Sequence, residues 1–176
     1  MSAVDNQPSN PNFLSQLGFK FSIKKLPNTN YFVQGINLPG MNLGETQEPS
    51  PFVRIPVPGD HLSFNELVMT FRVDEDMRNY LELHDWLRGL GFPDNFQQYK
   101  ALNDQTFNEF GSGEGILSDA SLMILNSAMN PNIEVTFEDV YISSLSDLDF
   151  TYSGLDVDYI TCTANFRYKI YKINRL

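Results

Sequence analysis

Side chains on which most catalytic and metal sites depend are scarce in this sequence. Cys162 is the only cysteine, and His61 and His84 are the only histidines, among 176 residues. A lone cysteine excludes a disulfide within the chain and a thiolate metal cluster built by one chain. Cys162 also alternates with Ile160 and Ala164 as in a buried strand. With so few partners, no Ser-His-Asp or Cys-His arrangement can be argued, so we expect no catalytic residue, no metal site and no cofactor.

Positive charge and long apolar runs are also lacking. The chain has 12 Lys and Arg against 22 Asp and Glu, a net charge of -10, whereas proteins that grip nucleic acid concentrate basic residues. No window approaches the roughly 20 apolar residues of a membrane helix, and the start of the chain lacks the regions of a signal peptide. We therefore expect no phosphate-gripping surface, no membrane partner and a protein that stays in the cytoplasm where it is made.

The clearest local pattern is a strand followed by a helix. Apolar residues recur at period two from Glu66 to Val73, which predicts a half-buried strand. Asp74 then suits an N-cap, and Gly91 suits the left-handed residue that ends a helix. Between them, apolar residues recur at helical spacing at Met77, Tyr80, Leu81, Leu83, Leu87 and Leu90. We expect one principal helix over about residues 74–90, with this stripe lying on a sheet.

Most of the remaining chain predicts antiparallel β-structure. Residues 157–173 alternate at period two, and a strand of that length would span ~45 Å, beyond the usual strand. We expect it to bend across two sheets or to reach out of its own subunit. The other expected strands cover residues 19–24 and 31–36, joined as a hairpin by a turn at 27–30, and residues 120–125, 133–142 and 145–152. The fold class is therefore α+β, mainly antiparallel β, with one principal helix.

The domain organisation follows from composition. With 41% hydrophobic residues, the chain can bury a core as one domain over residues 13–176. Residues 1–12 are polar and predict a flexible arm, and residues 95–118 predict a long, Gly-containing insertion. Prolines in the expected extended loop at 42–60 exclude a central strand but allow an edge or an arm across a neighbour. Phe52, Val53, Ile55 and Val57 would be the hydrophobic anchors of that arm. The alternative is an ordered loop folded onto its own subunit.

A set of motifs resembles a known family in order and spacing. It comprises Leu38-Pro39-Gly40, Ile55 to Asp60, Phe64, Leu67 to Phe71, Asp74-Glu75-Asp76 and Trp86. Over about residues 30–91 it resembles the tail tube proteins of contractile-tailed bacteriophages. The resemblance implies a non-enzymatic ring subunit, with two packed β-sheets in a sandwich and one helix, in which hexamers pool hairpins into a barrel around a channel for DNA.

The resemblance also implies partners and a location. The chain would form hexameric rings of the inner tail tube in the virion, after assembly in the host cytoplasm. It would bind itself within and between rings, bind other tube, sheath or baseplate proteins, and meet DNA only as passing cargo during ejection. Because related tube folds also start or end tubes, the alternative is a baseplate initiator or a terminator ring. The arm at 42–59 and the insertion at 95–118, which a plain stacking subunit would not need, favour this alternative.

Acidic and basic residues suggest surfaces for that assembly. Asp147 and Asp149, like Asp156 and Asp158, are two residues apart, so each pair projects from one face of a strand. If residues 145–158 form a hairpin of the tube wall, these carboxylates would line an acidic channel that repels DNA and lets it slide. As Asp-x-Asp metal motifs they lack a surrounding βαβ unit.

Basic residues gather near the two chain ends, while acidic residues dominate the middle. Arg167 and Lys169 would then serve head-to-tail contacts between subunits, since such contacts need two complementary patches. Scattered solubilising charge is the alternative.

Two other classes of function stay open on the sequence. A monomeric carbohydrate-binding β-domain would expose aromatic platforms, for which the candidates are Tyr99, Phe107 and Phe110. A carboxylate-dependent hydrolase, such as a glycosidase with a carboxylate pair, would depend on Asp147 or Asp149.

Overall fold

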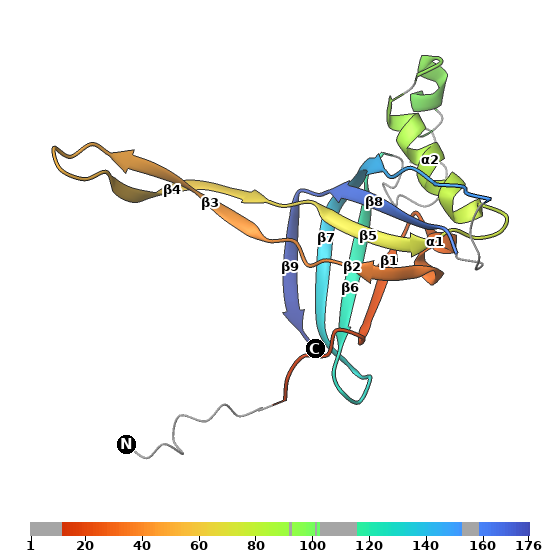
Figure 1. The fold of residues 1–176 in the computed structure, drawn as a ribbon, viewed down its shortest axis with the longest axis horizontal. Helices are drawn as coiled ribbons and strands as arrows, with labels where there is room; N and C mark the ends of the chain where they lie inside the picture. The colour runs from red at the N-terminus through yellow and green to blue at the C-terminus, as the bar shows by residue number, and fades with distance from the viewer. Residues whose placement is uncertain (1–11, 92, 101, 103–115, 153–158) are drawn as a thin grey trace.

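The chain folds into a bent β-structure from which a long hairpin and a helix project in different directions (Figure 1). The computed structural model describes residues 12–91, 93–100, 102, 116–152 and 159–176. The elements in chain order are β1 (Phe19–Ile23), α1 (Pro27–Tyr31), β2 (Val33–Ile36), β3 (Met41–Glu48), β4 (Ile55–Phe64), β5 (Leu67–Arg72), α2 (Arg78–Gly91), β6 (Ser118–Leu125), β7 (Pro131–Leu145), β8 (Thr161–Arg167) and β9 (Ile170–Arg175).

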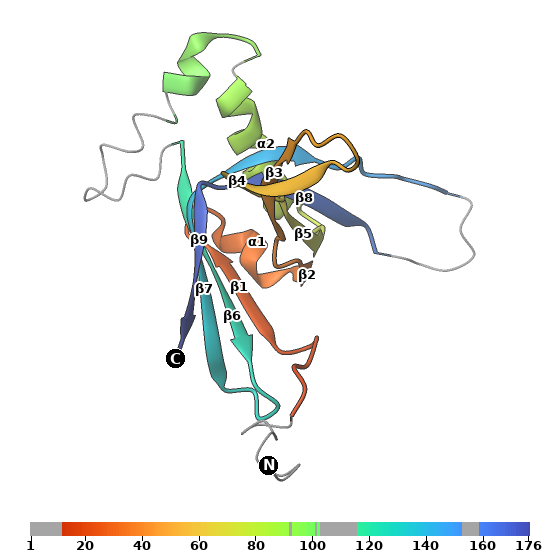
Figure 2. The same cartoon turned by 90° about the vertical axis from the view of Figure 1, so that its left-hand side faces the viewer.

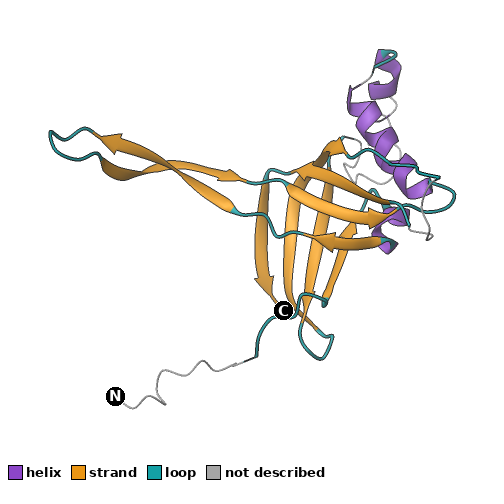
Figure 3. Cartoon of the chain, in the orientation of Figure 1, coloured by secondary structure: helices purple, strands orange, loops and turns teal. Residues whose placement is uncertain are grey.

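Two antiparallel sheets share the strand β7 (Figure 3). The first sheet has the order β1-β6-β7-β9, and the second has the order β2-β5-β8-β7. β7 changes sheet between Val140 and Tyr141, and Asp139, with a φ of 56°, lies at a bulge just before that point. The last expected strand also changes sheet, because the chain turns between β8 and β9. The expected α+β, mainly antiparallel fold of two packed sheets is confirmed.

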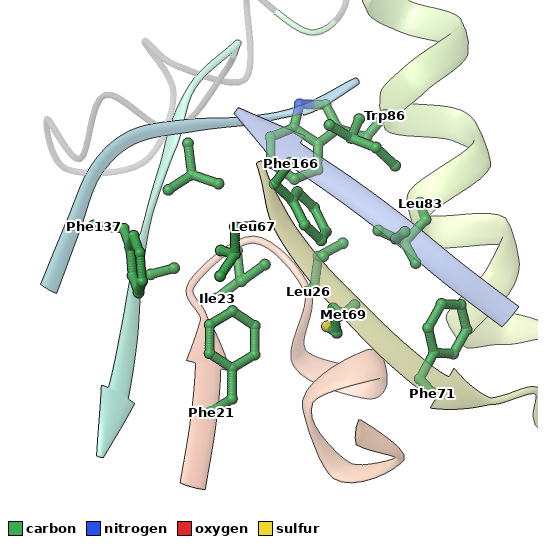
Figure 4. Close-up of a cluster of buried hydrophobic side chains, with 14 of the residues drawn as sticks. Phe21, Ile23, Leu26, Leu67, Met69, Phe71, Leu83, Trp86, Phe137 and Phe166 are labelled. Carbon is green, nitrogen blue, oxygen red and sulfur yellow. The ribbon is translucent and has the colours of Figure 1, made fainter. Parts of the chain in front are cut away.

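A single hydrophobic core lies between the two sheets and beneath α2 (Figure 4). From α2, Leu83 and Trp86 are buried, and the Trp86 ring centroid lies 6.2 Å from that of Phe166 on β8. The Trp86 indole donates a hydrogen bond to the Ile116 carbonyl at 3.1 Å, so its polar edge is satisfied. The fully buried side chains from the sheets include Ile23, Leu67, Met69, Phe71, Val135, Phe137, Val140, Ile142 and Phe166.

The expected hairpin between residues 19–24 and 31–36 does not form. Residues expected as a turn form α1, which has Pro27 at its start. The Asn30 side chain accepts from the Ile23 N–H and donates to the Ile23 carbonyl, both at 2.9 Å. It thereby occupies the outer edge of β1 at Ile23, next to where β2 would have paired. Instead β1 pairs with β6, and β2 pairs with β5.

The principal helix begins later than its sequence suggested, at Arg78 rather than Asp74. The buried Asn79 side chain accepts from the Asp74 N–H at 3.1 Å and donates to the Arg72 carbonyl at 2.7 Å. These bonds tie the chain into a turn, and Met77 adopts a φ of 55°, outside the helical region. No helix in the described part of the chain is both long and apolar enough to cross a membrane.

Candidate assembly surfaces

The Cys162 thiol and both histidine side chains have hydrogen-bonding partners close by. Burial raises the pKa of the Cys162 thiol, which favours its neutral form. His61 lies 2.7 Å from Asp60, and His84 lies 3.3 Å from Asp85, in exposed pairs. Among the described residues, no group of three His, Cys, Asp or Glu side chains is placed to hold a metal ion.

The hairpin formed by β3 and β4 stands away from the body, as two perpendicular views show (Figures 1 and 2). All of β3 is exposed, and most of β4 is too. In the connecting loop, the side chain of Phe52 is 94% exposed. The other exposed large apolar residues of this hairpin are Met41, Leu43, Val53, Ile55, Val57 and Leu62. So many exposed large apolar residues on one projecting hairpin are typical of an interaction site.

The hairpin replaces the extended loop expected over residues 42–60. Pro56 and Pro58 lie within β4, opposite Gln47 and Glu45. Proline is tolerated there because a two-stranded hairpin has two outer edges, where a missing N–H breaks no ladder bond. A bulge follows Leu43 in the pairing. The expected anchors Phe52, Val53, Ile55 and Val57 are at the tip and along β4, not folded onto the body.

The backbones of β3 and β4 pass very close to each other in the middle of the hairpin. A Cβ atom on Gly59 would lie 2.7 Å from the Gly44 carbonyl oxygen. That distance is shorter than any ordinary contact, so glycine is needed at position 59. A Cβ on Gly44 would lie 3.5 Å from the His61 carbonyl oxygen, which is an ordinary contact.

The first sheet ends in two strand edges that no described strand covers. At one end β1 pairs only with β6, and at the other β9 pairs only with β7. Ile173 on β9 pairs with the buried Val135, yet its side chain is 55% exposed. Beside β1 runs a groove of about 720 Å³, lined by residues of β1, α1 and β2 that include Phe19, Phe21 and Val33. Unpaired edges of this kind are places where another chain can add a strand.

The basic residues expected at subunit contacts have partners within the chain. Arg167 lies 2.8 Å from Glu66, and Lys169 lies 3.6 Å from Asp139. Both basic side chains remain largely exposed. Exposed pairs of this kind contribute roughly 0 to 1 kcal/mol to stability, so their partners do not prevent a second contact. A role of Arg167 and Lys169 between subunits stays a prediction.

Two of the acidic residues expected in the channel, Asp147 and Asp149, do not lie on a strand. The strand expected over residues 145–152 is wrong beyond Leu145, where β7 ends. The Ser146 side chain accepts from the Thr163 N–H at 2.9 Å, in place of a backbone carbonyl. After it the chain leaves the sheet, and Asp147 and Asp149 are exposed on an irregular segment.

Several predictions concern residues outside the described ranges. Asp156, Asp158, Phe107 and Phe110 are among them, as are the arm at 1–12 except for its last residue and most of the insertion at 95–118.

The chain is similar to several proteins that are named tube terminators or terminating caps. The chain is 22% identical over 182 residues to the tail tube terminator protein of Enterobacteria phage T4, covering 99% of this chain and 93% of that protein. Its structure matches the tube terminating cap of the anti-feeding prophage with a TM-score of 0.61, at 10% identity, over 100% of both chains. This chain has the tube fold.

A second solved structure agrees. The sheath/tube terminator of the extracellular contractile injection system PVC matches the tube fold of this chain with a TM-score of 0.60, at 11% identity, over 93% of this chain and 97% of that chain. No protein-family model matches the chain. The resemblance to tube-fold proteins, stated above from short motifs, is confirmed.

Sequence reasoning missed two features of these surfaces. The strand edges were missed because pairing partners are long-range: β1 meets β6, about a hundred residues later. The aromatic residues Tyr168 and Tyr171, which pack at the base of the hairpin, were read as parts of one alternating strand. Their signal was available, because two tyrosines three residues apart do not share a face of an extended strand.

Proposed function

We propose that this protein is a tail tube terminator, a ring that closes the end of the inner tube of a contractile phage tail. The observation that carries the proposal is the match to the terminator of phage T4, which spans 99% of this chain. Two solved tube terminators share the fold over 100% and 93% of this chain. This support favours the terminator alternative over the broader prediction of a main tube subunit. The proposal assigns the chain a structural role in the virion, without catalysis or a cofactor.

The two free edges of the first sheet support a closed ring. Successive strands in the order β1-β6-β7-β9 are antiparallel, so β9 of one copy would meet β1 of the next in antiparallel orientation. Each copy thus offers two different edges, and such a head-to-tail contact forms a ring when its rotation closes. The exposed Ile173 of β9 would enter the neighbour's groove beside Phe19 and Phe21. We propose a hexamer, as the resemblance to tube proteins implies.

Ring closure would also decide which face meets DNA. The second sheet and α2 cover one face of the first sheet, and they are too bulky to point into a narrow channel. The opposite face would then line it. Along that face Lys20, Lys24 and Lys172 are balanced by Asp119, Glu134 and Glu138, and Lys24 lies 3.1 Å from Asp119. A wall with balanced charges suits DNA as passing cargo, because it holds no phosphate tightly.

In a ring of this geometry, the aspartates expected to line the channel would lie elsewhere. Asp147 and Asp149 follow the end of β7 that belongs to the second sheet, so they would lie off the channel wall. A channel lined by these aspartates is the competing proposal.

The hairpin supports a contact with the adjacent ring. Ten residues of β4 extend about 33 Å at about 3.3 Å per residue, enough to leave the subunit's own ring. Its exposed apolar residues, above all Phe52 and Val53, would be buried only against another protein. The partner would be the last tube ring or a neighbouring sheath or baseplate protein of the same tail.

Capping of purified tail tubes tests the proposal. We expect the protein to form rings, seen by negative-stain electron microscopy and sized by light scattering, and to bind one end of each tube and stop its growth. Long tubes formed by the protein alone would instead make it a main tube subunit. A monomer that leaves tube ends unchanged at high concentration would overturn the assembly proposal.

Substitutions at the β9 edge and at the hairpin tip test the two proposed contacts one at a time. Leu176 N–H donates to the Asn132 carbonyl, so alternation points the Ile173 N–H away from β7 and toward the free edge. Ile173→Pro should therefore keep the fold and lose the ring, whereas Ile173→Ala should keep the edge N–H and weaken the ring less. Phe52→Ser with Val53→Ser should keep the ring and lose tube binding. Rings that form normally with Ile173→Pro would exclude the proposed edge pairing.

A further inference from the structure

Four aromatic rings gather where the hairpin joins the body. Phe64 ends β4, Phe137 lies on β7, Tyr168 lies at the turn between β8 and β9, and Tyr171 lies on β9. Tyr168 contacts Phe137 and Phe64 with ring centroids 5.2 and 5.8 Å apart. Tyr171 contacts Phe64 and Phe137 at 5.6 and 5.7 Å. This aromatic cluster joins the hairpin to the shared strand β7 and to the edge strand β9.

The two tyrosine hydroxyls reach both roots of the hairpin. Tyr168 donates a hydrogen bond to the Asn65 carbonyl at 3.0 Å, directly after β4. Tyr171 donates one to the Pro39 carbonyl at 3.2 Å, shortly before β3. The Asn65 N–H in turn donates to the Gly40 carbonyl at 3.0 Å. Both chains of the hairpin are thus held at their point of entry by side chains of one short segment.

The orientation of the hairpin must be set at these roots. Among the described strands, β3 and β4 pair only with each other, and an isolated two-stranded hairpin has little rigidity of its own. Its length also magnifies errors: a rotation of about 10° at the root would move a tip about 33 Å away by about 6 Å. A shift of that size would misplace Phe52 and Val53 against any surface they are shaped to meet.

The environment of the Tyr168 hydroxyl favours its protonated, hydrogen-bond-donating form. Burial, and secondarily the neighbouring Tyr171, raise the pKa of Tyr168 to about 12. The Tyr168 hydroxyl therefore keeps its proton, and remains a donor, throughout the neutral range. Nearby, Arg167 donates to Glu66 at 2.8 Å, which adds an exposed contact between the end of β8 and the residue before β5.

We propose that Tyr168 and Tyr171 are positioning residues that fix the angle of the β3–β4 hairpin against the edge strand β9. One short segment then supports both the strand that would close the ring and the hairpin that would meet the next ring. The two contacts of a subunit are thereby held in a fixed relation. The consequence for capping rests on the proposed function, whereas the orientation of the hairpin does not.

A distance measurement on the free protein tests the positioning. Spin labels would be placed on Gln47→Cys in the hairpin and Lys20→Cys on β1, both exposed, with the buried Cys162 left unlabelled. We expect one narrow distance distribution in this background. Tyr168→Phe with Tyr171→Phe removes only the two hydroxyls, and we expect it to broaden the distribution at least about twofold. If the double variant does not fold, the single Phe variants carry the test, each with a smaller broadening.

Two controls separate positioning from general stability. Leu122→Val weakens the core on β6, which contributes none of the four aromatic rings and neither hydroxyl hydrogen bond at the hairpin roots, and should leave the distribution narrow even at an equal loss of thermal stability. Tyr152→Phe removes a fully exposed hydroxyl and should change nothing. A narrow distribution in the double Phe variant, or equal broadening by Leu122→Val, would overturn the inference.

Capping assays then measure how the orientation of the hairpin affects binding to tube ends. The double Phe variant should form rings like the parent protein and occupy tube ends at least about tenfold less at equal concentration. Full occupancy despite a broadened distribution would show that hairpin orientation does not matter for capping. If the parent protein caps no tubes at all while the distance result holds, the proposed function fails and the positioning stands.

Discussion

The body and the β3–β4 hairpin of this protein differ in where they place their large apolar side chains. In the body, strands and α2 bury large side chains such as Trp86, Phe137 and Phe166 almost completely. In the hairpin, residues of the same type, such as Phe52 and Val53, are left in solvent. The body can therefore be stable as a single chain, because its apolar surface is satisfied internally. The exposed apolar side chains of the hairpin contribute no such stabilisation until another protein buries them.

The residues that stabilise the fold are therefore largely different from the residues that are exposed for contact with other proteins. Substitutions in the body should act on the free energy of unfolding, whereas substitutions in the hairpin should act on assembly. The aromatic cluster at Tyr168 and Tyr171 lies where the two regions meet. Two substitutions and one change of pH, taken from the largest expected effect to the smallest, test how sharp the separation is.

Trp86→Ala should have the largest effect, because it empties the contact between α2 and the sheets. Trp86 is 1% exposed, and its removal also leaves the Ile116 carbonyl without its donor. Truncation of a buried aromatic residue costs about 3 to 5 kcal/mol, which denaturant unfolding would measure. Leu81→Ala, on the exposed side of the same helix, is the control and should cost less than about 1 kcal/mol. Equal losses for the two variants would mean that α2 is not docked as described.

The elements of the body that the sequence predicted are those with a clear local pattern of apolar residues. The period-two run in β5 and the apolar stripe of α2 predicted both elements, because each buries one face against the core. The positive φ of Met77 and the Asn79 bonds that delay the helix could not be foreseen, since they depend on Arg72 being held in a sheet. The Asn30 side chain, which displaces β2 from β1, likewise acts through tertiary structure.

The hairpin was harder to predict for a different reason. Its prolines, including Pro56 and Pro58, argue against a strand in any sheet that continues on both sides. They are compatible with a strand only because the hairpin stands alone, and isolation is a property of the whole fold. Exposure of Phe52, Val53, Ile55 and Val57 was expected only under the arm hypothesis. The strand edges at β1 and β9 depend on pairings about a hundred and about forty residues apart in sequence, which periodicity does not encode.

Gly59→Ala should have an intermediate effect, confined to the hairpin. The added methyl would lie 2.7 Å from the Gly44 carbonyl oxygen, so the two strands must move apart. Overpacking of this kind costs about 1 to 3 kcal/mol, here as faster hydrogen exchange of β3 and β4 amides with little change in the body. Gly44→Ala meets only an ordinary contact and should leave the exchange rates unchanged. Faster exchange throughout the body would show that hairpin and body unfold as one unit.

Alkaline pH should produce the smallest effect, at the junction of the two regions. Burial, followed by the nearby Tyr171, raises the pKa of Tyr168 from 10.0 to about 12 in the folded protein. The folded state therefore binds the proton more tightly, so its advantage is complete below about pH 10 and is lost as pH rises through about 12. Because Tyr168 is only partly buried, screening by solvent keeps the loss small. The stability difference between the parent protein and Tyr168→Phe should shrink over this range, and a constant difference would mean that Tyr168 ionises as freely in the folded chain as in the unfolded one.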